Sequence, residues 1–176
     1  MSEADRLWRD RGLHEAVLAG DDRAWQTWYD ESYAALEAYV VWRCGGLRDL
    51  ADDAIQEAWL TAVRRVRAFD PERATFAAWL RGIAANVLRN LLRKRRSAAC
   101  GLAGVPAKPQ AAEPFRVAEA LAALPEHYER VLRMKYLDGR GVDEIAAEWA
   151  ETPKAVESLL TRARAAFRAA YGEDTP

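Results

Sequence analysis

The chain has 176 residues, of which 51% are apolar and 30% are charged, and its formal net charge is −1. This composition is typical of a globular protein rather than a disordered one, and the length allows one domain or two small ones. No run of about 18 uncharged apolar residues occurs, and the amino terminus lacks a basic segment followed by an apolar one, so we expect a cytoplasmic protein without membrane insertion. Cys44 and Cys100 have no second Cys or His at ligand spacing, so we expect no disulfide framework, no metal and no cofactor.

The charge is unevenly distributed along the chain. Residues 1–60 carry 6 basic and 13 acidic side chains, residues 61–100 carry 10 and 2, and residues 101–176 carry 10 and 12. The net charges of these three blocks are therefore −7, +8 and −2. A basic block beside an acidic one indicates two partner surfaces, one for a polyanion and one for a basic or mixed protein face. A solvated helix with scattered basic residues would give the same distribution, so charge alone leaves both interpretations open.

Strong helix formers dominate the sequence and no convincing alternating strand pattern occurs, which predicts an all-α fold. The first predicted helix covers about 13–19 and ends near Gly20. Asp21 then serves as the N-cap of a second helix over 22–43, which the glycine pair at 45–46 closes.

A third helix is predicted over about 49–68, and its residues separate into two faces at helical steps of about 100°. The predicted core face is Ala51, Ile55, Ala58, Trp59, Ala62 and Val66. The opposite face is Asp53, Gln56, Glu57, Leu60 and Arg64. An apolar Leu60 among acidic and amide side chains resembles a modest protein interface. A solvated face with one stray leucine fits equally well.

A fourth helix is predicted over 76–96. Its predicted buried stripe is Phe76, Leu80, Ile83, Ala84, Val87 and Leu91. Beside it runs a ribbon of Trp79, Gly82, Asn86, Arg89, Asn90 and Arg93, followed by the basic cluster 93–96. Cations suit phosphates, amides suit base edges and aromatic rings stack on unpaired bases, so the ribbon favours a nucleic-acid contact. Trp79 could equally belong mostly to the core.

The loop before that helix, 69–76, places Phe69 and Phe76 at the two ends of a short polar turn. A base extruded from a duplex would need an aromatic pocket of this kind. Alternatively both rings pin the turn to the core, which we favour for Phe76.

Helical periodicity is lost over 97–115, where glycines and prolines gather, which indicates a flexible linker. We therefore expect two small helical domains, 1–96 and 116–176. The helices expected in the second domain are 116–123, 126–137, 142–150 and 153–171. Thr152 is a good N-cap for the last of them, with Pro153 in its first turn.

The last two predicted helices have the lengths of a helix-turn-helix. Val156, Leu160, Ala163 and Phe167 form the inward stripe of the final helix. Its outward side chains, which would enter a major groove, are Lys154, Ser158, Thr161 and Arg162. Helix pairs with short turns are also common in proteins that bind no DNA, so this motif does not decide the function alone.

Several short motifs together point to one family. In the first domain they are GDDRAW at 20–25, DDAIQEAW at 52–59, FDP at 69–71 and FAAWLRGIAAN at 76–86. In the second they are LP at 124–125, LDG at 137–139, EIA at 144–146, Val156, and TRAR at 161–164. In these residues and their order the chain resembles the extracytoplasmic-function sigma factors, the small two-domain promoter-specificity subunits of bacterial RNA polymerase, over roughly 13–171.

The resemblance implies a role for each group of candidate residues. Those implied to bind core RNA polymerase, on the clamp helices of its β′ subunit, are Asp52, Asp53, Gln56, Glu57 and Leu60. The β subunit is a further implied partner of the chain. Those implied to bind the minus-ten element are Phe69, Arg73, Trp79, Asn86, Arg89, Asn90, Arg93 and Lys94. Those implied to bind the minus-thirty-five element are Lys154, Glu157, Ser158, Thr161, Arg162 and Arg164.

The resemblance also implies how these groups act. The first domain would hold an extruded base of the melted non-template strand, with binding free energy rather than hydrolysis driving the opening. The second domain would read promoter DNA as duplex, and the linker would thread through the polymerase. An anti-sigma protein holds many such chains inactive.

The predicted helix-turn-helix departs from the family pattern in several positions. Glu151, Glu157 and Leu159 stand where small, apolar or basic residues are usual, and Trp149 replaces a common leucine. Glu157 would repel phosphate unless it accepts from a cytosine amino group or pairs with Arg162 or another nearby cation. We therefore expect an unusual or weak minus-thirty-five preference.

Two other functions are compatible with parts of the sequence. An autonomous helix-turn-helix regulator would bind duplex DNA without polymerase, although the acidic first domain argues against it. A helical scaffold or inhibitor would bind polymerase or a sigma factor without contacting DNA. An enzyme is not expected, because His14 and His127 fall in different domains with no nucleophile or metal ligand at suitable spacing.

Overall fold

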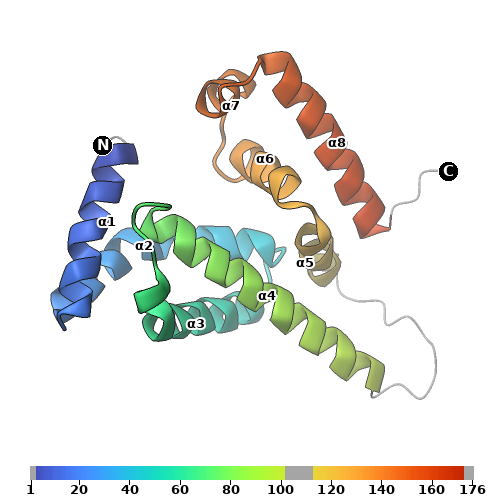
Figure 1. The fold of residues 1–176 in the computed structure, drawn as a ribbon. Coiled ribbons are helices and arrows are strands. Elements are labelled where there is room, and N and C mark those ends of the chain that lie inside the picture. The colour runs from blue at the N-terminus through green and yellow to red at the C-terminus, as the bar shows by residue number, and fades with distance from the viewer. Residues whose placement is uncertain (1–2, 102–112, 173–176) are drawn as a thin grey trace. The chain divides into compact units, whose positions relative to one another are not determined.

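The computed structural model describes residues 3–101 and 113–172, which form helices and turns without a strand (Figure 1). The all-α prediction is therefore confirmed. The chain divides into two compact units. The first comprises Met1–Val41 with Arg48–Arg95, and the second comprises Trp42–Leu47 with Arg96–Pro176.

The first unit is built around a cluster of aromatic rings. Its helices are α1 (Glu3–Leu18), α2 (Asp22–Arg43), α3 (Arg48–Arg65) and α4 (Phe76–Gly101), with a short 3₁₀ turn, η1 (Val66–Ala68), between the last two. The last residues of α2 and of α4 belong to the second unit. The Trp28 ring of α2 stacks on Phe76 with their centroids 3.9 Å apart and their planes at 4°. Phe69 meets both rings edge-on at 5.8 Å. This cluster holds the start of α4 against α2.

Helix α1 begins at Glu3, ten residues earlier than the predicted start at 13. The segment 3–12 is mostly charged, so it carries no apolar periodicity from which a helix could be predicted. Polar contacts attach it to α2 instead: Arg9 pairs with Glu31, and Asp10 accepts a hydrogen bond from the indole of Trp28.

The other end of the first unit also differs from the prediction. Helix α3 ends at Arg65 and the chain tightens into η1, rather than continuing as one helix to 68. Helix α4 runs to Gly101, five residues into the predicted linker 97–115, because the Ser-Ala-Ala-Cys segment before that glycine contains two alanines, the best helix formers. Residues 102–112 of the predicted linker lie outside the described residues.

The second unit contains four helices around an aliphatic core. They are α5 (Glu113–Ala123), α6 (Glu126–Tyr136), α7 (Val142–Trp149) and α8 (Pro153–Tyr171). Helix α5 starts three residues before the predicted 116, since a helix tolerates a proline such as Pro114 in its first turn. The core consists of Val131, Leu132, Met134, Ile145, Ala146, Val156, Leu160 and Ala163. Within this unit Arg43 and Glu129 form an ion pair whose side chains are only 6% and 8% exposed.

Candidate functional site

The acidic face of α3 is exposed as the sequence predicts. Asp52, Asp53, Gln56, Glu57 and Leu60, here called the α3 face, all lie at the surface, and Leu60 is 43% exposed. The opposite side of the helix is buried through Leu50, Ala51, Ala54, Ile55, Ala58 and Ala62. Of the predicted core face, Trp59 and Val66 are only half-buried. The burial of one side of α3 therefore presents its acids and Leu60 outward together.

Aromatic side chains of α2 extend this surface, and the sequence analysis did not predict them as part of it. The Tyr29 ring lies 5.0 Å from Trp59 and 5.1 Å from Tyr33, yet Tyr29 is 42% exposed. Burial, and then the negative charge of Glu37, raises the pKa of Tyr33 above its ordinary value. Aromatic rings beside an acidic face with an exposed leucine match the composition of a protein interface better than that of a solvated surface.

The ribbon predicted on α4 is present and is held together by its own hydrogen bonds. Gly82, Asn86, Arg89, Asn90, Arg93 and Lys94 are exposed and Trp79 is half-buried; we call this set the α4 ribbon. The guanidinium of Arg89 donates to Asn86 Oδ1 at 2.8 Å, and that of Arg93 donates to Asn90 Oδ1 at 3.3 Å. Each asparagine is thereby oriented by an arginine one turn away, with its amide nitrogen left to donate.

An ion pair connects the α4 helix to the α3 face. Arg95 Nη2 lies 3.7 Å from Asp53 Oδ2, and both side chains are exposed. A surface pair of this kind contributes about 0–1 kcal/mol. It nevertheless places one carboxylate of the α3 face against the basic end of α4, so a change at Asp53 also changes the surroundings of Arg95.

The loop between η1 and α4 is shaped by a short polar turn. The carboxylate of Asp70 accepts from the backbone N–H of Glu72 at 3.0 Å, and the Asp70 carbonyl accepts from the N–H of Arg73 at 3.2 Å. Thr75 caps α4, since its hydroxyl accepts from the N–H of Ala78 at 3.3 Å. The turn leaves Arg73 exposed at the loop surface.

The structure corrects one predicted DNA contact in this loop. Phe69 is 3% exposed and packs edge-on against His14, Trp28 and Phe76. It is a core residue because the loop needs an apolar anchor where η1 ends, and its ring offers no free face to a base. Both phenylalanines therefore pin the loop to the core.

The final helix presents the predicted polar face. Val156, Leu160 and Ala163 are buried, whereas Lys154, Glu157, Ser158, Thr161, Arg162 and Arg164 are exposed. The Thr152 hydroxyl accepts from the N–H of Ala155 at 3.2 Å, as its predicted N-cap role requires. Ala150, with φ of 53°, ends α7 in the left-handed region and turns the chain into α8.

The exposed side chains of α8 bond differently from those of α4. Thr161 donates to the carbonyl of Glu157 at 2.9 Å, and Arg162 to that of Ser158 at 3.4 Å. Arg164 donates to the hydroxyl of Tyr136 at 2.8 Å, and Tyr136 is 59% exposed. Tyr136 is a neighbour of this surface that the sequence analysis did not identify.

The structure also bears on the alternatives for Glu157. Among the side chains of residues 3–101 and 113–172 that the structure places, none forms an ion pair with Glu157. Arg162 bonds to backbone instead. Within the part of the chain that the structure describes, the carboxylate therefore places a negative charge without an ion-pair partner on the outward face of α8.

The parts of the chain that the structure describes hold no group of three or more His, Cys, Asp or Glu side chains able to bind a metal ion. No helix in these same parts combines the length and the apolar character needed to cross a membrane.

Models of two sigma-factor domains match the chain. The model of sigma-70 region 2 matches residues 23–98, and that of sigma-70 region 4 matches residues 115–167. The first match contains the α3 face and the α4 ribbon, and the second contains the exposed face of α8.

Curated relatives are themselves sigma factors. The RNA polymerase sigma factor CnrH of Cupriavidus metallidurans is 31% identical over 186 residues, spanning 94% of this chain and 96% of the relative. The probable RNA polymerase sigma factor RfaY of Xanthomonas campestris is 30% identical over 69% of this chain, and the ECF RNA polymerase sigma factor BldN of Streptomyces coelicolor is 32% identical over 48%. The chain spans only about a third of the length of these last two, 34% and 31%.

A solved structure supports the same relationship. The structure of CnrH in complex with the cytosolic domain of CnrY aligns over 94% of this chain and 99% of that chain, with a TM-score of 0.52 and 30% sequence identity. Two domain models in the expected order, together with a relative matched along nearly its whole length, establish the family. The chain is a member of the extracytoplasmic-function sigma factors of the sigma-70 family.

Proposed function

We propose that this chain binds core RNA polymerase, directs it to specific promoters and promotes melting of the minus-ten element. The observation that carries the proposal is the α4 ribbon: two exposed Asn–Arg pairs and a half-buried tryptophan on one side of a helix whose other side is core. This arrangement offers cations, amides and a ring to DNA at fixed positions.

The α3 face is the proposed polymerase-binding surface. Its carboxylates would attract a basic surface, and Leu60 with Tyr29 would supply the apolar centre that a stable protein interface needs. The resemblance to the family assigns this surface to the β′ clamp. The pairing of Asp53 with Arg95 fits a role in which polymerase binding and DNA binding influence each other.

Melting at the minus-ten element is assigned to the α4 ribbon together with Arg73. Extruding a base costs a few kcal/mol, and stacking and phosphate contacts of about 1–3 kcal/mol per base can offset that cost. Binding free energy therefore suffices, and no chemical step is required. Lys94 and its basic neighbours would hold the phosphates of the displaced strand.

Duplex reading at the minus-thirty-five element is assigned to the exposed face of α8. Lys154, Ser158, Thr161 and Arg162 lie on the outward side of a helix that follows a short turn, as in a helix-turn-helix. Glu157 stands among them without an ion-pair partner in the described chain, so we expect this half of promoter recognition to be weak or unusual.

A protein partner besides polymerase is part of the proposal. The related CnrH has been solved in complex with the cytosolic domain of CnrY. By analogy, a partner protein of the anti-sigma type would bind this chain and keep it from polymerase.

Transcription from a library tests the proposal. Core polymerase freed of its own sigma factor is mixed with the full chain and a plasmid library of random DNA, and the transcript starts are sequenced. The expected result is a discrete set of starts that share a minus-ten sequence and show permanganate-reactive thymines around it. Transcription no different from that of core alone would overturn the proposal.

The same materials separate the two rival functions. Tight binding of duplex DNA by the chain alone, without transcription, would indicate an autonomous regulator. Binding to core without any effect on DNA opening would indicate a scaffold or inhibitor.

A further inference from the structure

Helix α1 contacts the loop that precedes α4 through three side chains on one side. Asp10, Arg11 and His14 reach residues 66–76, although more than fifty residues separate the two segments. The match to sigma-70 region 2 begins only at residue 23, so α1 lies outside it.

Asp10 makes the central contact. Its Oδ1 accepts from the indole Nε1 of Trp28 at 2.8 Å, and its Oδ2 accepts from the backbone N–H of Phe76, also at 2.8 Å. Phe76 is the first residue of α4, and the N–H groups of a first turn have no partner within their own helix. The carboxylate therefore caps α4 from another helix and favourably meets the positive end of its dipole.

Two further contacts hold the preceding residues. His14 Nε2 donates to the carbonyl of Val66 at 2.9 Å, and its ring lies edge-on to Phe69 at 5.3 Å. Arg11 forms an ion pair with Glu72, one of the residues of the polar turn. The beginning, middle and end of segment 66–76 are each attached to α1.

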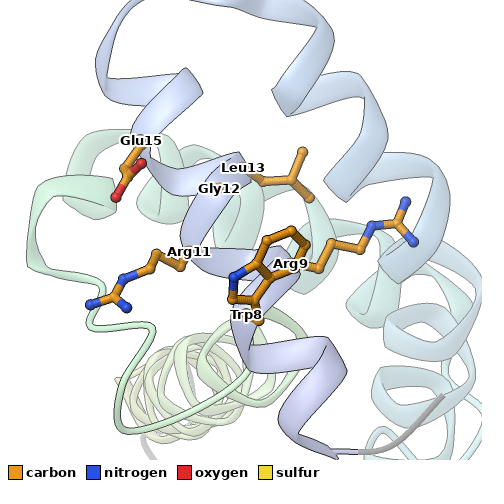
Figure 2. Close-up of a pocket in the computed structure, with 6 residues that line it drawn as sticks. All are labelled: Trp8, Arg9, Arg11, Gly12, Leu13 and Glu15. Atoms are coloured by element: carbon orange, nitrogen blue, oxygen red, sulfur yellow. The ribbon is translucent and has the colours of Figure 1, made fainter.

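The other side of α1 provides a matched comparison. Figure 2 shows Arg9 and Arg11 pointing to opposite sides of the helix. Arg9 pairs with Glu31 of α2, and within the described residues it forms no hydrogen bond or ion pair with segment 66–76. Between the two arginines lies a hollow of about 330 Å³ beside Trp8, which is 78% exposed. Two arginines of α1 therefore bind different segments: Arg9 binds α2, and Arg11 binds the loop before α4.

We propose that Asp10 is a positioning residue for promoter melting, which sets the loop 69–76 and the first turn of α4 in the arrangement that receives the extruded base. This inference rests on the function proposed above for the α4 ribbon. The physical reason is preorganisation: a loop fixed before DNA arrives loses less conformational freedom on binding. Asp10 acts through Phe76 and the loop and does not itself touch DNA.

The first test is Asp10→Asn in the full chain, with Glu15→Gln on the exposed side of α1 as the control. A carboxamide has one oxygen and an NH₂ group, so one of the two N–H donors facing Asp10 loses its acceptor. Holoenzymes are compared on a promoter selected by the wild-type protein, as duplex and as a template premelted over the minus-ten element. Binding to core is measured alongside.

The expected result for Asp10→Asn is an opening rate on duplex lowered by about tenfold or more, a smaller decrease on the premelted template, and unchanged core binding. The Glu15→Gln variant should match wild type. Unchanged opening of duplex by Asp10→Asn would overturn the inference, and so would equal losses on both templates together with lost core binding, since that pattern indicates general damage to the fold. Failure of the wild-type protein to open any promoter would instead overturn the proposed function.

A second test uses a surface pair, whose removal leaves the core intact. Arg11→Gln and Glu72→Gln should each lower opening by about two- to threefold, and the double variant by no more than either, because both remove one interaction. Arg9→Gln, which makes the same change of charge on the other side of α1, should leave opening unchanged. If Arg11→Gln lowered promoter opening and Glu72→Gln did not, Arg11 would act on DNA directly. That result would overturn the proposal that α1 holds the loop through this ion pair.

Discussion

Helices α4 and α8 both expose arginines beside small polar side chains, but they fix them differently. On α4 the arginines bond to asparagines of the same ribbon, and the first turn is capped by both Thr75 and Asp10. On α8 Thr161 and Arg162 bond only to the backbone of their own helix, and Thr152 caps it locally. Under the proposed function, this difference would make α4 a preorganised surface for DNA and α8 a helix with more adaptable side chains.

The charges of the two segments support the same contrast. The block 61–100, which contains most of α4, carries +8, whereas 101–176 carries −2. Attraction to phosphate, which is independent of sequence and weakens steeply with salt, should therefore come chiefly from the basic block 61–100 and not from the acidic remainder of the first unit. The second unit must contribute through a few specific contacts.

The largest effect should come from breaking the α4 ribbon. In Asn86→Ala with Arg89→Ala, an oriented amide and its cation are both lost, and we expect promoter opening to fall by about a hundredfold, since such contacts to bases contribute about 1–3 kcal/mol each. Permanganate reactivity of the minus-ten thymines measures the effect. Gln26→Ala with Arg23→Ala, which removes an exposed side-chain amide and an exposed arginine at the same spacing on α2, is the control. Similar losses in both variants would indicate that charge rather than the ribbon matters.

A smaller effect should follow from removing the local cap of α8. Thr152→Ala leaves the N–H of Ala155 without its acceptor and should lower the free energy of unfolding of the second unit by about 1 kcal/mol. Hydrogen exchange of the α8 amides in the full chain measures it. Ser158→Ala, which removes an exposed hydroxyl from the same helix, should leave their exchange rates unchanged. Equal acceleration in both variants would contradict the capping role.

The unneutralised carboxylate of α8 offers a way to sharpen the comparison. Glu157→Gln removes a negative charge from the face proposed to meet phosphates, and we expect the holoenzyme to bind duplex containing the minus-thirty-five region about two- to fivefold more tightly at low salt. Glu126→Gln at the start of α6 is the charge-matched control. Weaker binding by Glu157→Gln would mean that the carboxylate accepts from a cytosine amino group instead.

The smallest effect concerns Tyr33 beside the α3 face. Burial raises the pKa of Tyr33, so above about pH 10 the folded state retains a proton that the unfolded state releases, and stability falls as the pH rises. Tyr33→Phe should remove this part of the loss of stability above pH 10. Below pH 9 the stability of the variant should depend on pH as that of the wild type does. Denaturant titrations at several pH values measure it. If the free energy of unfolding fell equally in both proteins above pH 10, the pKa of Tyr33 would not be raised in the folded state.

Helical periodicity was sufficient to predict the exposed faces of α3, α4 and α8, because it determines which side chains share a side. It was less accurate for the buried side of α4, where Leu88 and Leu92 are buried, whereas Val87 and Leu91 of the predicted stripe are only half-buried. The Thr152 cap was predictable for the same reason, since a cap and its acceptor lie within three residues. The length of α1 was not, because segment 3–12 is held by polar contacts rather than by an apolar stripe.

The other features that could not be predicted from the sequence depend on contacts between segments far apart in the chain. The bond between Asp10 and the N–H of Phe76 joins residues 66 positions apart, and no pattern around an aspartate in a charged helix indicates it. The placement of Tyr29 beside Trp59 and of Tyr136 beside Arg164 depends likewise on how helices pack. Phe69 was assigned to DNA because its flanking position suggested a pocket, whereas packing made it part of the core.

Binding of the labelled full chain to bacterial core RNA polymerase tests the central claim most directly. The wild-type protein should co-migrate with core, whereas Asp53→Arg with Gln56→Ala, which reverses a charge and removes an amide on the α3 face, should lose at least about tenfold in affinity. Asp22→Arg with Gln26→Ala, the equivalent change on α2, should bind as wild type does. Absence of co-migration by the wild-type chain, or equal binding by all three proteins, would contradict the account.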